Sequence, residues 1–561
     1  MRRAVPLLAV LGSGAAMALA LPLVVPWLSL RELDPAGHLE VVAWVALVPL
    51  LVAVGRAGSG RAAFGLGLLG GLAYFFAAIH WVSHAMTAFG GLPFGLALLA
   101  LTLLVAFMAF HWGLAAWAVF TLRRGLGWPA WLAAPPAFTA AELLRNYLFT
   151  GFPWGHLGYT QARTPAVAQL AALLGVSGLG FLVVLVNAAL ADALEARLGG
   201  RALPRGGQAP GAGPRLGLAV AAGLLLLTVG GGAWRLRALR AEMAAAPTLT
   251  VGLVQPNLDQ GQKNRARDHV AYVLDRLVPL TQEADRQGAD LVAWPEAAFP
   301  AYVRPSITTF DGARARLPPL GRAHLLLGAA TLEEVGRGPE GPTWRVENST
   351  FMVGPDLRVL GRYVKHHLVP FGEYVPLAEW LPFIGRVVPG MAPASPGGAL
   401  QLLEFPGPGG RPVRVGSMIC FDAIFPEIGR ALAAQDPDLL VNPTNDAWYG
   451  YSSGPYQFLA IVRLRAVETG RAIARPAYAG VSALILPTGE LAPGAIDVGP
   501  VDPALAPDPA EQPRLLVGRV PVLHGRTPFT SIGHLFGHAC AVATLAALAA
   551  AWRRRRQAAT A

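Results

Sequence analysis

The chain has 561 residues, of which 54% are hydrophobic and only 14% charged, and its formal net charge is +11. Ordinary soluble domains contain roughly 25% charged residues, so this composition argues against a wholly soluble protein and indicates membrane-spanning segments. The basic excess does not indicate nucleic-acid binding, because the arginines cluster between apolar segments and form no stripe on one domain.

Eight apolar stretches are predicted to cross a membrane, since a spanning helix needs about 20 mostly apolar residues. They lie near residues 5–27, 39–55, 62–84, 91–121, 127–146, 170–194, 216–234 and 533–552. The first follows two arginines and resembles a secretory signal peptide, but further spans directly downstream favour an uncleaved helix. The fifth is interrupted by Pro135 and Pro136. Its Glu142 and Arg145 are three residues apart, so they can face each other near the membrane edge.

The arginines also predict the orientation of these spans, because cytoplasmic loops are enriched in Lys and Arg. With a cytoplasmic N-terminus, most arginines that flank spans fall on the cytoplasmic side, including the run Arg553 to Arg556 after the last span. The opposite loops carry only Arg31, Arg145 and Arg163. Three arginines after the seventh span fit less well, but they precede a long domain, and such domains cross largely regardless of charge. The segment between spans seven and eight is therefore predicted to lie outside the cytoplasm.

From about residue 247 to 522 the pattern changes to short β-rich apolar runs, such as TLTVGLVQPN, ADLVAWPE and VRVGSMICFD. Helical stretches near 266–288, 424–435 and 456–474 lie between several of these runs. This alternation predicts a layered α/β domain. The predicted organisation is a membrane domain over 1–246, the α/β catalytic domain over 247–522, and the last span with a basic cytoplasmic tail over 523–561.

Three side chains suited to acyl transfer follow separate strand patterns. They are Glu296 in DLVAWPEAAFP, Lys365 in GRYVKHHLVPFGEY and Cys420 in VGSMICFDAIFPE. A thiol that attacks a carbonyl must lose its proton, and Glu296 is the candidate base. The negative oxygen of the tetrahedral intermediate needs a donor, which Lys365 and the backbone N–H of Phe421 can supply.

Scarcity supports the choice of the lysine. Lys and Arg together number 45, yet lysine occurs only at Lys263 and Lys365. A chain that meets its need for positive charge with arginine is expected to keep lysine where a guanidinium will not serve. Taken singly, each candidate also has a structural interpretation, since a lone cysteine is most often a small buried hydrophobe and a lone glutamate a cap or surface residue.

No cofactor or metal is expected. HxxH and HExxH spacings are missing from the sequence, and the pair His366 and His367 is expected to orient or solvate a loop. The two cysteines, Cys420 and Cys540, lie in different surroundings, one of them in the last apolar stretch, and do not suggest a disulfide framework.

The motifs WPE, YxKxHLVPFGE and ICFD resemble those of the nitrilase, or carbon-nitrogen hydrolase, superfamily. Together with the preceding spans, TGFPWGHLGYTQ at 150–161 and TNDAWYG at 444–450, the chain resembles the apolipoprotein N-acyltransferases. The resemblance implies an αββα sandwich attached to an eight-helix membrane domain, in the bacterial inner membrane and facing the periplasm. It also implies that Cys420 is the nucleophile, Glu296 the base, Lys365 the stabiliser of the intermediate and Glu373 a second essential glutamate.

The implied reaction passes a fatty acyl chain from a phospholipid, usually phosphatidylethanolamine, to the cysteine as a thioester. The α-amine of a diacylglyceryl-cysteine at the N-terminus of an apolipoprotein would then accept the chain. Both partners are membrane lipids or lipid-anchored proteins, and no nucleic acid is involved. Because water must be kept from the thioester, the apolar segment 375–394 is expected to form an entrance, or else ordinary core.

The chain departs from the usual family pattern at three places. Cys-Phe-Asp stands where the family usually has Cys-Tyr-Glu, Asn264 stands where a Trp often follows the lysine of a mobile loop, and RPAYAG replaces an RxTNxG-like run. These changes are expected to affect substrate positioning. The residues expected to support or bind substrate are Phe421, Asp422, Asn445 and Trp448.

Two other classes of function remain open from the sequence. A membrane-tethered amidase or nitrilase could use the same three residues on small amides. A transporter or receptor could use the outer domain only to bind a ligand, although the spans contain few buried charges and no paired broken half-helices.

Overall fold

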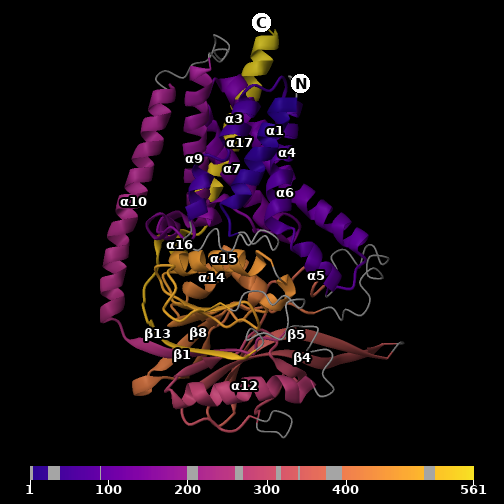
Figure 1. Cartoon of the computed structure of the whole chain (residues 1–561), viewed down its shortest axis with the longest axis vertical. Coiled ribbons are helices and arrows are strands. Elements are labelled where there is room, and N and C mark those ends of the chain that lie inside the picture. Colours follow the sequence, from indigo (N-terminus) through magenta and orange to yellow (C-terminus); the bar gives the residue numbers. More distant parts are fainter. Residues whose placement is uncertain are drawn as a thin grey trace. The chain divides into compact units, whose positions relative to one another are not determined.

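The computed structural model describes residues 4–22, 38–88, 90–198, 213–258, 269–310, 317–338, 341–374, 394–450, 452–497 and 512–560. The chain divides into two compact units (Figure 1). The helical unit comprises Met1–Ser83, Leu98–Arg237 and Ser531–Ala561, and the α/β unit comprises His84–Ala97 and Ala238–Thr530. The predicted domain boundaries at 246 and 522 stay predictions.

Within the described residues, each predicted span contains helical structure. The helices are α1 (Ala4–Leu19), η2 (His38–Trp44), α3 (Val48–Gly55), α4 (Gly60–Ile79), α5 (Val82–Ala88), α6 (Phe94–Leu126), α7 (Ala130–Tyr147), η3 (Leu148–Thr150), η4 (Leu157–Gln161), α8 (Pro165–Ala168), α9 (Ala171–Arg197), α10 (Pro214–Ala245), α16 (Pro528–Ile532) and α17 (Leu535–Thr560). Within the described residues, five helices are long and apolar enough to cross a membrane, namely α4, α6, α9, α10 and α17. The helix at α1 and the stretch Leu39–Gly55 are apolar but shorter. By length and composition, five of the eight predicted spans are therefore helices that could cross a membrane within the described residues.

One of the shorter stretches has a polar reason for its shape. The stretch over η2 and α3 is interrupted between Trp44 and Val48, and Asn187 of α9 satisfies the freed backbone groups there. Its Oδ1 accepts from the Leu47 N–H at 2.8 Å, and its Nδ2 donates to the Ala43 carbonyl, also at 2.8 Å. A buried side-chain amide thus makes non-helical backbone tolerable among apolar helices.

The predicted pair Glu142 and Arg145 of α7 is buried, and each residue bonds to the segment that follows the helix. Glu142 Oε1 accepts from the Leu157 N–H at 2.8 Å, and an Arg145 guanidinium nitrogen donates to the Trp154 carbonyl at 2.7 Å. Because buried charged groups must be satisfied by hydrogen bonds, these two contacts fix the 150–161 motif against α7.

The α/β unit contains two sheets. The first has the order β13-β1-β2-β4-β5-β6, with β3 paired to β4, and the second has the order β12-β11-β10-β9-β8-β7. The strands are β1 (Thr248–Gln255), β2 (Leu291–Ala293), β3 (Phe299–Val303), β4 (His324–Gly338), β5 (Gly341–Val353), β6 (Val359–Val364), β7 (Leu403–Pro406), β8 (Pro412–Ser417), β9 (Leu439–Val441), β10 (Ile473–Arg475), β11 (Val481–Ile485), β12 (Ile496–Asp497) and β13 (Arg514–Pro521).

The two sheets lie between helices, so the α/β unit is an αββα sandwich (Figure 1). Helix α12 (His269–Arg286) packs on the first sheet, and α14 (Pro426–Ala433) and α15 (Gly454–Thr469) pack on the second. All residues of β2, β9, β10 and β11 are buried, as expected for strands covered on both faces. The fold class predicted from the sequence is confirmed.

Parallel pairing brings several strand ends to the same region of the sandwich. Strands β1, β2 and β4 run parallel, as do β8, β9 and β10. A hydrogen bond of 3.1 Å from Thr350 Oγ1 on β5 to Ser417 Oγ on β8 joins the two sheets. The residues that follow β2, β6, β8 and β9 therefore converge, and these are the segments that carry the predicted site.

A glycine in β4 makes room for the turn after β2. A Cβ atom added to Gly328 would lie 2.2 Å from the Pro295 carbonyl oxygen and 3.2 Å from the Glu296 Cα. Both obstacles are backbone atoms, which no change of rotamer can move away. The turn that carries Glu296 therefore depends on the absence of a side chain at this position.

We expect Gly328→Ala to lower the free energy of unfolding by about 1–3 kcal/mol, the usual cost of overpacking. Gly336→Ala in the same strand is the matched control, because a Cβ there has open space. Thermal unfolding of the two purified variants measures the difference. Equal midpoints for both variants would contradict the tight contact at Gly328.

Candidate active site

A buried lysine between two glutamates forms the centre of the site. Lys365 follows β6, and its Nζ lies 2.9 Å from Glu296 Oε1 and 2.9 Å from Glu373 Oε1. The lysine side chain is 1% exposed, and those of Glu296 and Glu373 are 8% and 17% exposed. Burial alone would lower the pKa of Lys365, but the two carboxylates outweigh it and raise the pKa well above its usual value. The ammonium is therefore charged.

Asn348 completes this cluster and was not predicted from the sequence. Its Nδ2 donates to Glu296 Oε1 at 2.8 Å and to Glu373 Oε1 at 3.1 Å, and its backbone carbonyl accepts from the Lys365 N–H at 2.8 Å. One amide group thus holds both carboxylates beside the ammonium. The signal that could have found it is the strand register, since β5 and β6 pair with Ser349 opposite Val364.

The tryptophan of the WPE motif holds the turn that carries Glu296 in place. Trp294 is fully buried, its Nε1 donates to Thr281 Oγ1 of α12 at 2.8 Å, and its backbone N–H donates to Leu326 of β4 at 2.9 Å. These anchors position Glu296 at the end of β2.

Cys420 lies in a tight turn after β8, at the first residue of the short helix η6 (Cys420–Ile424). Its φ angle is +46°, a left-handed conformation that an L-residue other than glycine rarely adopts. The Cys420 N–H donates to the Pro443 carbonyl at 2.8 Å, and Asn442 Nδ2 donates to the carbonyls of Met418 and Cys420 at 2.8 and 3.3 Å. The surrounding structure thus holds the thiol in a strained, fixed turn.

The thiol is close to the charged cluster. Burial raises the pKa of the Cys420 thiol, and the negative charge of Glu296 raises it further. Lys365, a hydrogen bond from Thr444 and the backbone N–H of Asn445 act in the opposite direction. At neutral pH the resting side chain is a thiol, so a nearby base must take its proton before it can attack a carbonyl.

Asp422 anchors the turn that carries Cys420. Its hydrogen bonds go to residues other than Lys365. Its carboxylate accepts from the Ile419 N–H at 3.0 Å, the His367 N–H at 2.7 Å and the Tyr363 hydroxyl at 3.1 Å. Burial raises the pKa of Asp422 to about 7, although these hydrogen bonds favour the charged form. Both oxygens are engaged, which makes Asp422 a positioning group between the lysine loop and the cysteine turn.

The segment after β9 covers the thiol from another side. Thr444 Oγ1 lies 3.4 Å from Cys420 Sγ and 3.4 Å from Asp446 Oδ1. Asp446 forms a fully buried bidentate ion pair with Arg475, with N–O distances of 2.8 and 3.0 Å. Arg475 is the first residue of the RPAYAG run, which departs from the usual family pattern. The run nevertheless keeps the buried arginine that pairs with Asp446.

The remaining predicted residues occupy different places around this centre. Phe421 is buried, and its ring packs against Phe425 and His367, with ring centroids 5.4 and 5.8 Å apart. Asn445 Oδ1 caps the short helix η7 (Asp446–Tyr449) through the Ala447 N–H at 3.2 Å. Trp448 in that helix is 39% exposed. Lys263, Asn264 and all but the last residue of the predicted entrance at 375–394 lie outside the described residues.

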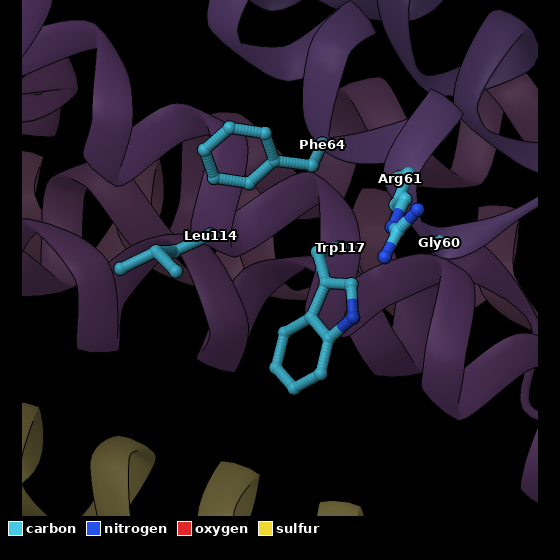
Figure 2. Close-up of a pocket in the computed structure, with 5 residues that line it drawn as sticks. All are labelled: Gly60, Arg61, Phe64, Leu114 and Trp117. Carbon is cyan, nitrogen blue, oxygen red and sulfur yellow. The ribbon is translucent and has the colours of Figure 1, made fainter.

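Within the described residues, the helical unit offers no comparable chemistry. Cys540 lies in α17 of the helical unit. A cavity of about 340 Å³ in that unit is lined by Gly60, Arg61, Phe64, Leu114 and Trp117, which include no thiol, carboxylate or amine (Figure 2). Among the described residues, no three His, Cys, Asp or Glu side chains gather in a way that could hold a metal ion.

The arrangement around Cys420 provides the parts that acyl transfer needs. A buried nucleophile lies near a carboxylate that can accept its proton, and an ammonium with a third N–H is fixed beside both. The Asn348 amide holds Glu296 and Glu373 beside Lys365, and the buried Asp422 positions the turn that carries Cys420. The roles of the individual residues follow as proposals below.

Two family models match consecutive parts of the chain. The model described as the apolipoprotein N-acyltransferase N-terminal domain matches residues 13–189, and the model described as carbon-nitrogen hydrolase matches residues 250–499. Among solved structures, an amidase from Nesterenkonia sp. is 22% identical, covering 52% of this chain and 95% of its own, with a TM-score of 0.33.

The similarity to curated relatives extends over most of the chain. An apolipoprotein N-acyltransferase of Geobacter metallireducens is 33% identical over 526 residues, which is 93% of each chain. Those of Allorhizobium ampelinum and Caulobacter vibrioides are 36% and 33% identical, covering 76% and 78% of this chain. Bacterial relatives and long apolar helices indicate a bacterial membrane protein. The chain belongs to the apolipoprotein N-acyltransferase family.

Proposed function

We propose that the protein transfers a fatty acyl chain from a membrane phospholipid, through a thioester on Cys420, to the α-amine of the diacylglyceryl-cysteine of apolipoproteins. The observation that carries this proposal is the buried Lys365 held between Glu296 and Glu373 next to a buried thiol. A chain that joins this cluster to apolar helices has the nucleophile and the access to lipid that the reaction requires.

In the first half-reaction, Glu296 accepts the thiol proton as the Cys420 sulfur attacks an ester carbonyl of the phospholipid. The oxygen of the tetrahedral intermediate receives hydrogen bonds from Lys365 and from the backbone N–H of Phe421. The carbon–oxygen ester bond then breaks, and Glu296 returns the proton to the departing lysophospholipid hydroxyl. Cys420 is left as a thioester.

In the second half-reaction, the α-amine of the lipoprotein attacks the thioester carbonyl, and Glu296 accepts a proton from the amine. The same donors stabilise the second tetrahedral intermediate. The carbon–sulfur bond breaks, the thiolate takes the proton back, and the amide product leaves. Glu373 and Asn348 keep Lys365 and Glu296 in register during both steps, and Asn445 and Trp448 support the bound substrate.

The donor is phosphatidylethanolamine, and the α/β unit faces the periplasm from the inner membrane. The placement of arginines supports this orientation, since most of them flank the spans on the opposite side. One substrate is a membrane lipid and the other a lipid-anchored protein, which accounts for the fusion of an enzymatic unit to apolar helices.

The decisive experiment combines the purified chain with phosphatidylethanolamine vesicles and a diacylglyceryl lipopeptide. We expect release of lysophospholipid, an acylated Cys420 peptide by mass spectrometry, and an N-acylated lipopeptide. An amidase would hydrolyse small amides without releasing lysophospholipid, and a ligand-binding protein would do neither. Either of these results would contradict the proposal.

Cys420→Ala should fold normally but form no acyl-enzyme and no product, because no other thiol lies in the cluster. Cys540→Ala should retain activity, since Cys540 lies in the helical unit. Mass spectrometry of the acylated peptides and product analysis measure both effects. If Cys540→Ala alone were inactive, the nucleophile would have to be reassigned.

Lys365→Arg should lose about 10²–10³ in rate, the usual effect of losing one oxyanion donor. The charge is kept, but the Lys365 side chain is only 1% exposed. A broad planar guanidinium does not fit the space that one ammonium occupies between two carboxylates. Single-turnover lysophospholipid release measures the loss. Near-normal turnover would remove Lys365 from the mechanism.

Glu296→Gln should abolish acyl-enzyme formation, because an amide cannot accept the thiol proton. Asp422→Asn should only slow it, since Asp422 is engaged by Ile419 and His367 and positions the turn. Single-turnover acylation separates this step from transfer to the amine. If Asp422→Asn abolished acylation while Glu296→Gln proceeded at the wild-type rate, Asp422 would be the base.

A further inference from the structure

Thr444 has a hydroxyl between the nucleophile and a buried ion pair. Thr444 follows β9 and is fully buried. Its N–H donates to the Pro476 carbonyl and its carbonyl accepts from the Tyr478 N–H, both at 3.0 Å, so its backbone is held in place. Its Oγ1 lies 3.4 Å from Cys420 Sγ and 3.4 Å from Asp446 Oδ1. The hydroxyl proton can therefore point toward either of these two acceptors.

A threonine hydroxyl carries one proton, so it donates to the sulfur or to Asp446 but not to both. Asp446 does not depend on this proton, because Arg475 already binds both of its oxygens, at 2.8 and 3.0 Å. A distance of 3.4 Å is long for a hydroxyl–carboxylate bond, which usually measures about 2.5–3.0 Å. The bond to Asp446 is therefore easily given up.

We propose that the Thr444 hydroxyl is a catalytic donor that turns from Asp446 to the Cys420 sulfur when the thiolate forms, and turns back when the thioester forms. The inference deepens the proposed function, since its role in acylation rests on that function. No bond to Thr444 is made or broken, and the thiol proton itself still passes to Glu296.

The physical need for such a donor comes from burial. A thiolate in this site is removed from water, and a buried charge without hydrogen-bond donors is costly. The pKa of the Cys420 thiol is raised by burial and by Glu296, and the hydrogen bond from Thr444 acts against this. Once the sulfur is acylated it carries no charge, and Asp446 becomes the better acceptor.

The test is the pH dependence of Cys420 alkylation by iodoacetamide in the full-length chain, in a Cys540→Ala background that leaves one thiol. Thr444→Val removes the hydroxyl at nearly constant shape, and we expect the alkylation profile to move to higher pH by about one unit or more, as for a lost hydrogen bond to a charged group. Thr444→Ser keeps the hydroxyl and should retain the wild-type profile. Thr444→Ala provides a second deletion if the valine variant does not fold.

Thr469→Val is the matched control, because Thr469 is a buried threonine whose hydroxyl donates to the Arg465 carbonyl at 2.7 Å. It should leave the alkylation profile unchanged. An unchanged profile in folded Thr444→Val or Thr444→Ala, or an equal shift in Thr469→Val, would overturn the proposal.

Single-turnover acylation by Thr444→Val at neutral pH should fall about tenfold or more, which corresponds to the same shift. Alkylation needs no phospholipid, so it tests Thr444 even if the wild-type chain failed to release lysophospholipid. That failure would instead contradict the proposed function.

Discussion

The contact between one buried ammonium and two carboxylates governs the rest of the site. Lys365 can stay charged in the interior only because Glu296 and Glu373 lie within 2.9 Å of it. The glutamates in turn come from different strand ends, so the parallel pairing of β2 with β4 and the antiparallel pairing of β5 with β6 must both be in place. The cluster therefore ties the chemistry to the correct pairing of these strands of the first sheet.

The fold class and the main strands were predictable because apolar periodicity and strand–helix alternation report burial directly. Strands β3, β7, β10, β12 and β13 fall in none of the predicted runs. Strands β10 and β12 have only three and two residues and leave almost no periodic pattern. Helix spacing predicted that Glu142 and Arg145 can face each other, but not the contacts that both make with the segment after the helix. Spacing on a helix brings two side chains to one face, but the backbone of the 150–161 motif satisfies both.

Chemical type and scarcity were enough to select Glu296, Lys365 and Cys420 as candidates, and the structure brings them together. Asn348 and Thr444 could not be selected in this way. Both are common polar residues within or beside strands, and their importance depends on which atoms the sheet register places opposite them. Tertiary context, which a single sequence does not contain, determines that a particular amide or hydroxyl faces a reacting group.

The helical unit is assembled from segments on both sides of the α/β unit in the chain. Helix α17 packs against α7 and α9, and a side chain on Gly125 of α6 would collide with Ala551 of α17. Because a chain is synthesised from its N-terminus, the whole α/β unit is made before the helix that completes the bundle. During synthesis the surfaces of α7 and α9 that α17 covers must therefore stay unpaired. A chain shortened at this end would join a complete α/β unit to a helical unit that lacks this helix.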